Sequence, residues 1–215
     1  MMQIGLAVPM TTHLNQMADI LPGYPFRGAL ESRPDGNAWV IQVRHVSSRE
    51  WISLDSKGSA GDGKALDRVQ LPGRRAPDYV QPGDVLFMAR GPRNGAVLVE
   101  KVPEGTVCTP HFFLIRLKPA WRDSVDPRFL VWQLNHGEGR AAIAAGRQGS
   151  LVPSVRKTEL AAITLQLPSL ADQGHLAKLH QAADREARIL QKLIENRHRE
   201  ITAIGRTMLD AVRNG

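Results

Sequence analysis

The longest periodic pattern of hydrophobic positions lies in the last third of the chain. Apolar residues recur there at alternating spacings of three and four, and only His180 and Arg197 interrupt the series. Such a seam, sustained for about five heptads, is typical of a helix that pairs with another helix. The residues assigned to dimerisation are Leu176, Ala183, Ala187, Leu190, Ile194, Ile201, Ile204 and Met208.

This seam predicts a helix of roughly forty residues and about 60 Å, which is longer than a small core can cover. Pro168 ends the preceding segment, and Ser169 or Asp172 is suited to cap the helix. Gly205 weakens the last turns. Either the helix projects and meets another helix, or it is an amphipathic helix folded back on its own domain. Its length and regularity favour the first interpretation.

The preceding residues alternate between short apolar runs and turn residues. Residues 14–20 predict a short strand or helical turn, Arg33–Asn37 predicts a turn, and the glycine-rich residues 55–78 predict a long loop that is functional or mobile. Strands are expected at 39–46, 51–54, 85–89, 96–99, 112–117 and 161–167, and helices at 127–134 and 139–148. The fold class is therefore α+β, with one domain over residues 1–168 and a long coiled-coil helix over 169–215.

Composition and charge point to a polyanionic partner. The 215 residues carry a formal net charge of +7 and a pI near 10.1, which favours nucleic acid. The single cysteine, Cys108, excludes an internal disulfide framework, fits a reducing compartment and is expected to be a buried small residue. No run of eighteen apolar residues and no signal-peptide pattern occurs, so we expect a cytoplasmic protein without a membrane segment.

Catalytic and cofactor motifs are not found. No Gly-x-Gly-x-x-Gly follows a strand, and the glycines between Gly58 and Gly63 lack the Lys-Ser/Thr of a phosphate-binding loop. No tetrapeptide of an amino-methyltransferase occurs. Pro77-Asp78 lacks the acid-x-Lys partner of a metal-dependent nuclease, because Glu100 and Lys101 are adjacent. The histidines are scattered and fit structural positions better than metal ligation. We expect no enzyme activity, no metal and no cofactor in this chain.

Arginine is instead frequent in and beside the predicted turns. Its guanidinium neutralises phosphates and can donate two hydrogen bonds to guanine, while Asn and Gln can do the same for adenine. Each such residue alone is explained by a solvated surface. Their number on polar loops favours contact with DNA.

In order along the chain, the signals resemble the DNA-specificity subunit of type I restriction–modification systems. The matching segments are Ala18-Asp19-Ile20 with Gly23-Tyr24-Pro25-Phe26, the strand at 39–46, Gly83-Asp84-Val85-Leu86-Phe87, Phe113-Leu114-Ile115-Arg116, the helix start Asp126-Pro127-Arg128-Phe129-Leu130, Gly149–Val155, and Leu160–Gln173. The last of these, in which Leu-Pro-x-Leu-x-x-Gln enters a long helix, is the most specific.

The resemblance implies a target-recognition domain that reads half of a split DNA site and a long helix that fixes the distance between half-sites. Such subunits dock methyltransferase subunits, which supply S-adenosylmethionine chemistry, and a motor-nuclease subunit can join them. They usually have two recognition domains and two long helices, whereas this chain has one of each. A homodimer that pairs its helices would restore the layout and read an inverted repeat.

The resulting hypothesis is a non-catalytic specificity subunit that binds double-stranded DNA. The residues expected to contact DNA are Arg27, Arg44, His45, Arg74, Arg75, Arg90, Arg93, Asn94, Arg147 and Gln148. The alternative is a protein-interaction scaffold, or an orphan regulator of a methyltransferase, without its own DNA readout. A stand-alone nuclease or methyltransferase would need motifs that the sequence lacks.

Overall fold

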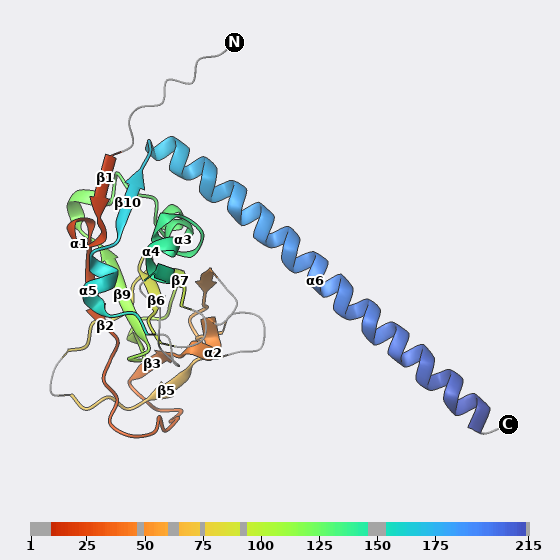
Figure 1. The fold of residues 1–215 in the computed structure, drawn as a ribbon. Coiled ribbons are helices and arrows are strands. Elements are labelled where there is room, and N and C mark those ends of the chain that lie inside the picture. The colour runs from red at the N-terminus through yellow and green to blue at the C-terminus, as the bar shows by residue number, and fades with distance from the viewer. Residues whose placement is uncertain are drawn as a thin grey trace, which may run out of the picture. The chain divides into compact units, whose positions relative to one another are not determined.

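The structure, a computed structural model, describes residues 10–46, 50–59, 65–73, 76–90, 94–145 and 154–213 (Figure 1). The chain divides into two compact units, an N-terminal unit up to Gly174 and a C-terminal unit from His175. The N-terminal unit combines mixed sheets with short helices, and the C-terminal unit is the continuation of one long helix. This α+β architecture with a long C-terminal helix confirms the fold class predicted from the sequence.

A five-stranded sheet forms the centre of the N-terminal unit. Its strand order is β2-β9-β6-β7-β4, in which only β4 runs parallel to its neighbour. All four residues of β6 are buried, which explains why its sequence is continuously apolar rather than alternating. The strands are β2 (Ala18–Pro22), β4 (Trp51–Ser53), β6 (Val85–Met88), β7 (Ala96–Lys101) and β9 (Phe112–Leu117).

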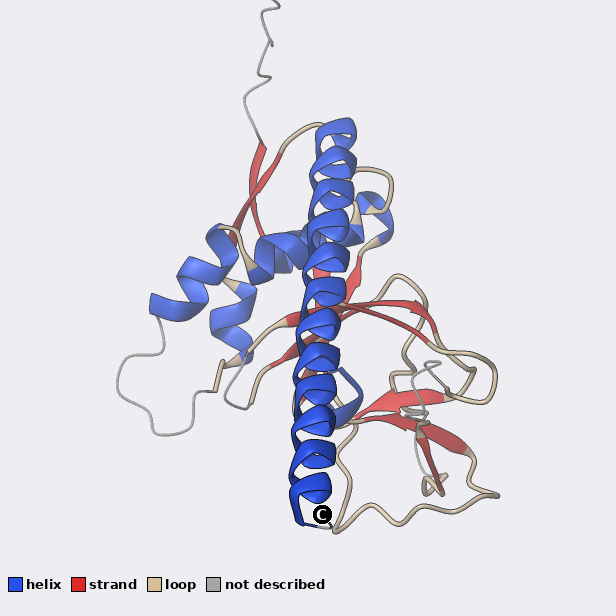
Figure 2. Ribbon diagram, turned by 90° about the vertical axis from the view of Figure 1, so that its right-hand side faces the viewer, coloured by secondary structure: helices blue, strands red, loops and turns tan. Residues whose placement is uncertain are grey.

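Two smaller sheets lie at opposite ends of this unit (Figures 1 and 2). A three-stranded sheet has the order β5-β3-β8, and a two-stranded antiparallel ribbon joins β1 to β10. The ribbon brings the first described strand beside the last one, so both ends of the N-terminal unit meet. The bounds are β1 (Met10–His13), β3 (Ala38–Ile41), β5 (Asp67–Val69), β8 (Thr106–Cys108) and β10 (Thr164–Leu167).

Short helices complete the N-terminal unit. Helix α3 packs against β7 and α4, and it begins where predicted, because Asp126 caps it by accepting a hydrogen bond from the backbone N–H of Arg128 (2.8 Å). Pro127 takes the first helical position, where its missing N–H has no cost. The helices are α1 (Leu14–Met17), α2 (Val43–Val46), the 3-10 helix η1 (Pro119–Trp121), α3 (Pro127–Asn135), α4 (Glu138–Ala145) and α5 (Lys157–Ala161).

A buried ion pair fixes the central sheet. Asp84 is 3% exposed and accepts hydrogen bonds from Nε and Nη2 of Arg116 at 2.8 and 2.7 Å. It also accepts one from the backbone N–H of Gln81 at 2.7 Å, which closes the turn containing Gly83 at a φ of +90°. This carboxylate raises the pKa of the Arg116 guanidinium, so the pair stays charged. The Gly83-Asp84 pair, which opens one of the segments that carry the family resemblance, thus has a structural role: it holds β6 against β9.

The long helix α6 spans Leu170–Arg213, or 44 residues, which corresponds to about 66 Å. Ser169 precedes it, and its hydroxyl accepts a hydrogen bond from the backbone N–H of Asp172 (3.2 Å). Gln173, 1% exposed, accepts from Asp126 N–H and donates to Ser124 O and Pro168 O at 2.9–3.0 Å. The block Leu-Pro-x-Leu-x-x-Gln therefore ties the first turn of α6 to the segment before α3. Gly205 does not end the helix.

Two strand predictions were too long. In the run at residues 39–46 the strand ends at Ile41 and α2 follows. Gln42 N–H donates to Nδ1 of His45 while His45 N–H donates to Gln42 O, both at 3.0 Å, and this reciprocal pair closes a helical turn. The run at 161–167 divides likewise into α5 and β10. Ala161 is the last residue of α5, whose first turn is set by Arg156 N–H donating to Glu159 at 2.8 Å, so the strand begins only at Thr164.

The other element predictions agree with the described residues except at residues 55–78. That segment was predicted as one long loop, but it contains β5, which forms because it pairs with the distant strand β3. Residues 14–20 form both alternatives, α1 followed by β2, and Gly36 N–H donates to Arg33 O (2.9 Å) in the expected turn. The predicted helix at 139–148 is α4 as far as Ala145, and its remainder lies outside the described residues. Within the described ranges, no helix is long and apolar enough to cross a membrane.

Candidate nucleic-acid interface

Half of the predicted DNA contacts lie in parts of the chain that the structure describes. They are Arg27, Arg44, His45, Arg90 and Asn94. The other five, Arg74, Arg75, Arg93, Arg147 and Gln148, lie outside the described residues. They remain predictions.

Arg44 and His45 belong to a hydrogen-bonded group at the end of β3, which we call the β3–β5 polar cluster (Gln42, Arg44, His45 and Asp67). The Asp67 carboxylate accepts a hydrogen bond from Nε2 of Gln42 at 2.6 Å and pairs with Nη2 of Arg44. Arg44 Nε lies 3.2 Å from Nε2 of His45, a residue that is 7% exposed. Because Nδ1 of His45 accepts from Gln42 N–H, Nε2 carries the ring proton, so this is a packing contact and not a hydrogen bond. The Arg44 side chain nevertheless stays 58% exposed. The cluster therefore presents a cation to solvent in a fixed orientation.

The adjacent position of the same two strands carries a stacked pair. Trp39 and Arg68 are opposite each other in the β3–β5 register, and the Arg68 guanidinium lies 4.9 Å from the centre of the Trp39 ring. Arg68 also donates from Nη1 to Pro34 O at 3.2 Å. A second arginine is thus oriented beside the cluster. Trp39 also packs against the core, so the stacked pair fixes the orientation of Arg68.

Asp67 is the member of the cluster that sequence reasoning did not identify. Its role follows from the antiparallel pairing of β5 with β3, which joins residues more than twenty positions apart. The polar, glycine-rich sequence around the short β5 gives no strand signal, and residues 55–78 were predicted as a loop. Only knowledge of this strand pairing could have selected Asp67.

Of the other predicted contacts, Asn94 differs from Arg27 and Arg90. Asn94 is 4% exposed, and its Nδ2 donates to Met88 O and Ala89 O, both at 3.0 Å, so its side chain shapes the loop after β6. Arg27 and Arg90 have exposed side chains. Arg27 precedes Gly28, whose φ of +87° gives the loop a sharp turn. Arg90 forms an isolated antiparallel bridge with Ser154. The structure therefore leaves Arg27, Arg44 and Arg90 as exposed cations.

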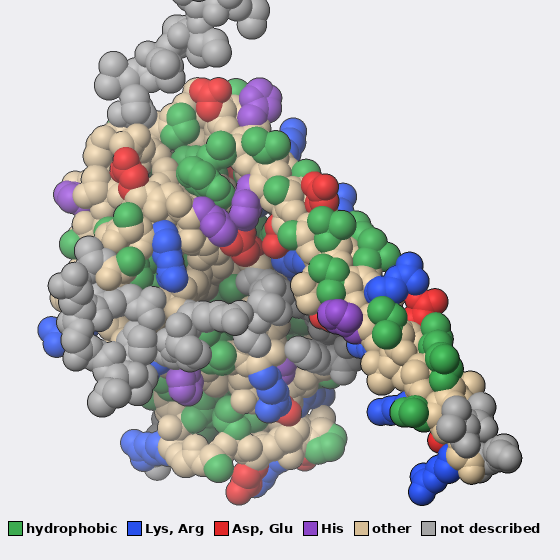
Figure 3. Space-filling model, turned by 45° about the vertical axis from the view of Figure 1, so that its right-hand side comes forward, with side chains coloured by type: hydrophobic (Ala, Val, Ile, Leu, Met, Phe, Trp, Pro, Cys, Tyr) green, Lys and Arg blue, Asp and Glu red, His purple; other side chains and the backbone are tan. Residues whose placement is uncertain are grey.

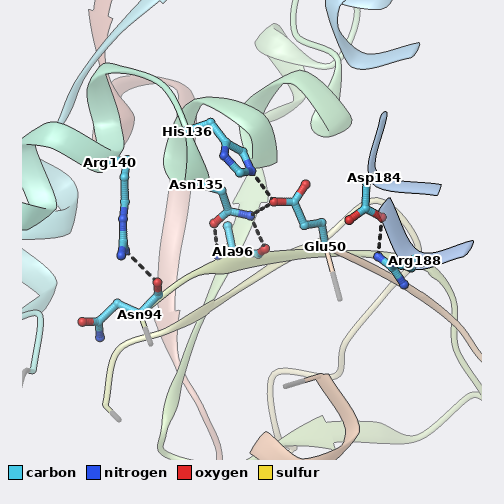
Figure 4. Close-up of polar contacts among 8 residues, drawn as sticks. All are labelled: Glu50, Asn94, Ala96, Asn135, His136, Arg140, Asp184 and Arg188. Atoms are coloured by element: carbon cyan, nitrogen blue, oxygen red, sulfur yellow. Dashed lines mark hydrogen bonds and ion pairs between the residues drawn. The ribbon is translucent and has the colours of Figure 1, made fainter. Parts of the chain in front are cut away.

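A second polar group, around Glu50, joins α3 to the central sheet. Figure 4 shows His136 and Asn135 both directed at the Glu50 carboxylate, to Oε1 at 2.6 and 3.0 Å. Asn135 also exchanges two hydrogen bonds with the backbone of Ala96, at 2.7 and 2.9 Å. Nearby, Arg140 donates to Asn94 O at 2.8 Å. These bonds tie α3 and α4 to the edge of β7, which is a structural task.

Cys108 is buried in the core, as predicted, at 2% exposure and without a disulfide. Burial raises the pKa of its thiol to about 12. A thiol with that pKa remains protonated at neutral pH, so Cys108 does not serve as a nucleophile.

The C-terminal unit exposes the apolar seam predicted for dimerisation. Leu190, Ile194, Ile201, Ile204 and Met208 are each 51–65% exposed, and Leu193 and Leu209 widen the stripe. Ala183 and Ala187 are exposed as well, and Leu176 is half-buried. Figure 3 shows hydrophobic side chains recurring along the helix. Such a run of exposed Leu, Ile and Met marks a contact surface.

Comparison with known proteins gives a likeness of structure only. No family model matches the chain. No curated protein matches it either. The HsdS subunit from Thermoanaerobacter tengcongensis is similar at a TM-score of 0.53 and 19% identity, over 86% of this chain and 44% of that one.

Two further solved structures agree. A chain from a type I R-M system, solved in a study of complex assembly and conformational transition, has a TM-score of 0.57 and 21% identity, over 86% of this chain and 45% of its own. The type I S subunit from M. genitalium has a TM-score of 0.55 and 15% identity, over 91% and 44%. This chain thus spans less than half the length of each. These likenesses, at 15–21% identity, concern the fold alone, and the chain has the fold of somewhat less than half of a type I restriction–modification specificity subunit.

Proposed function

We propose that the chain is a non-catalytic DNA-specificity subunit of a type I restriction–modification system. The observation that carries the proposal is the likeness to solved specificity subunits over 86–91% of the chain. The net charge of +7 supports a polyanionic partner. The N-terminal unit reads DNA, with Arg44 as its central described contact, and Arg27 and Arg90 contribute further.

The C-terminal unit supplies the pairing surface. Its exposed seam of Leu, Ile and Met accepts the same seam of a second copy, because an isologous contact buries both at once. Two recognition units then read an inverted repeat. A helix of about 66 Å separates them by roughly two turns of DNA, at about 34 Å per turn. Methyltransferase subunits dock on this assembly and supply the S-adenosylmethionine chemistry, and a motor-nuclease subunit can join.

The test uses the purified full-length chain and a library of randomised 40-base-pair duplexes. Binding should enrich one discrete sequence, arranged as an inverted repeat with a constant gap. Binding of a random duplex, followed by fluorescence anisotropy, should weaken steeply with salt, because neutralised phosphates release counterions. A flat salt response without enrichment would leave the scaffold or orphan-regulator alternative. Enrichment of a single half-site without a repeat would contradict the proposed dimer.

A further inference from the structure

The long helix carries a line of basic residues in addition to its apolar seam. We call it the basic stripe, and its members follow one another at intervals of seven residues: Lys178, Arg185, Lys192, Arg199, Arg206 and Arg213. All six side chains are exposed. At 1.5 Å per residue, neighbours lie about 10.5 Å apart along the axis and the stripe covers about 53 Å. Figure 3 shows Lys and Arg side chains beside the hydrophobic ones along this helix.

The basic stripe lies on the face opposite the seam. At about 100° per residue, a position two residues after Leu190 and two before Ile194 is rotated roughly 180° from the midline of the seam. Because both patterns repeat every seven residues, they drift around the helix together and stay opposed along its length. A second helix seated on the seam therefore leaves the stripe uncovered.

The charges of the helix are sorted by sign. Six of the eight Lys and Arg residues of α6 lie on the stripe and none of its acidic residues does, so chance placement explains the line poorly. The two remaining bases, Arg188 and Arg197, are the ones that pair within the helix, with Asp184 and Glu200, both at 2.6 Å. Figure 4 shows the Asp184–Arg188 pair. Glu195 and Asp210 are the acids nearest to the stripe, each three or four residues from two of its members, and Glu195 accepts a hydrogen bond from Gln191 at 3.1 Å.

A helix needs charges on its outer face for solubility, but not charges of one sign. Acidic residues at some of the six stripe positions would solvate the face equally well and would lower the repulsion between neighbours. Like charges about 10.5 Å apart repel weakly across a distance close to the Debye length, and a polyanion laid along them relieves this repulsion. We propose that the basic stripe of α6 binds the phosphate backbone of duplex DNA.

This inference rests on the proposed function and adds a second, sequence-independent DNA contact to it. Lys and Arg donate hydrogen bonds and cannot accept them, which suits phosphate oxygens. The stripe is as long as roughly one and a half turns of B-DNA. It therefore matches the DNA that must run between two half-sites, where no base has to be read. The seam fixes the spacing of half-sites, and the stripe holds the DNA that fills that spacing.

The experiment compares full-length wild type with the variant Arg185→Gln, Lys192→Gln, Arg199→Gln. Glutamine keeps a helix propensity close to that of the residues it replaces. Binding of a random 40-base-pair duplex is followed by fluorescence anisotropy between 50 and 300 mM salt. The slope of log affinity against log salt should become shallower by about 0.9 for each phosphate that is no longer neutralised, hence by about 2.7. The ratio of affinities for a library-selected duplex and a random one should not change.

The matched control is Arg188→Gln, which removes the same charge one turn away, from a residue already paired with Asp184. It should leave the slope unchanged, and light scattering should give all variants the mass of wild type. If wild type shows a steep slope of log affinity against log salt and the triple variant keeps the same slope, the stripe does not bind DNA, and the proposed function is unaffected. The same conclusion follows from a triple variant that keeps DNA binding but no longer binds the methyltransferase, since the stripe would then be a protein-docking surface. A wild type without salt-dependent binding overturns both.

Discussion

The two units of this protein differ in how far their large apolar side chains are exposed to solvent. In the N-terminal unit the large ones are enclosed: Phe87, Phe112 and Ile115 are 0–1% exposed. In α6 they are turned outward, with Ile194, Ile201 and Leu209 at 51–72%. Burial of a side chain of this size stabilises by about 1.5–3 kcal/mol. The first unit thus gains its stability from within the chain, whereas the second has unused apolar surface. The contrast fits the proposed division, in which the N-terminal unit contacts DNA and α6 pairs with a second copy.

The largest expected effect is on assembly. In the variant Ile194→Asp, Ile201→Asp, pairing would bury two carboxylates in each seam, and an unpaired buried charge costs several kcal/mol. We expect complete loss of self-association at micromolar concentration, measured by analytical ultracentrifugation, with thermal unfolding of the N-terminal unit unchanged. Asn196→Asp with Thr202→Asp adds the same charges beside the seam and should still dimerise. Equal masses for wild type and the seam variant would show that the exposed stripe is not a self-contact.

A smaller effect concerns the reading surface. Asp67 fixes Arg44, so Asp67→Asn should loosen the guanidinium and lower affinity for the selected duplex on the order of tenfold. Removal of a negative charge should at the same time raise affinity for random duplex, and these opposite signs separate positioning from a general charge effect. Arg44→Ala should relax the preference at the same base position in a repeated selection.

The control for this pair is Glu100→Gln, which frees Arg128 from its ion pair at 3.1 Å, away from the β3–β5 polar cluster. It should raise binding to both duplexes equally. If Asp67→Asn behaves in the same way, Asp67 has no positioning role. Arg44 would then be reassigned to phosphate contact.

The contrast also explains what the sequence could and could not predict. Local chemistry decides the helix that begins after Asp126 and the apolar seam of α6, and both were predicted from the sequence. The break after Ile41 depends on a reciprocal bond between Gln42 and His45, which alternation of polarity cannot show.

The candidate interface was harder to predict from the sequence for the same reason: its geometry depends on specific hydrogen bonds that the pattern of polarity does not show. Arg44 was selected as part of the strand predicted at 39–46, but its partner Asp67 is brought to it by a strand pairing across more than twenty residues. Asn94 has a polar side chain in an arginine-rich loop and still lies buried, because two backbone carbonyls need its amide. Composition of a loop does not say which side chains face solvent.

The smallest expected effect tests whether water reaches the core of the N-terminal unit. Burial raises the pKa of the Cys108 thiol to about 12 from an ordinary value of 9.0, so folding disfavours the thiolate. A group whose pKa rises on folding contributes full stability below its unfolded pKa, and that contribution declines as pH rises through 9 toward 12. Between pH 8 and pH 10, wild type should therefore lose about 1 kcal/mol more unfolding free energy than Cys108→Ala, in which nothing titrates at this position. Urea unfolding at both pH values measures the difference. Identical losses in the two proteins, or rapid alkylation of Cys108 in the folded state, would mean that water reaches the core beneath β8. The contrast between the enclosed apolar side chains of the N-terminal unit and the exposed ones of α6 would then be weaker.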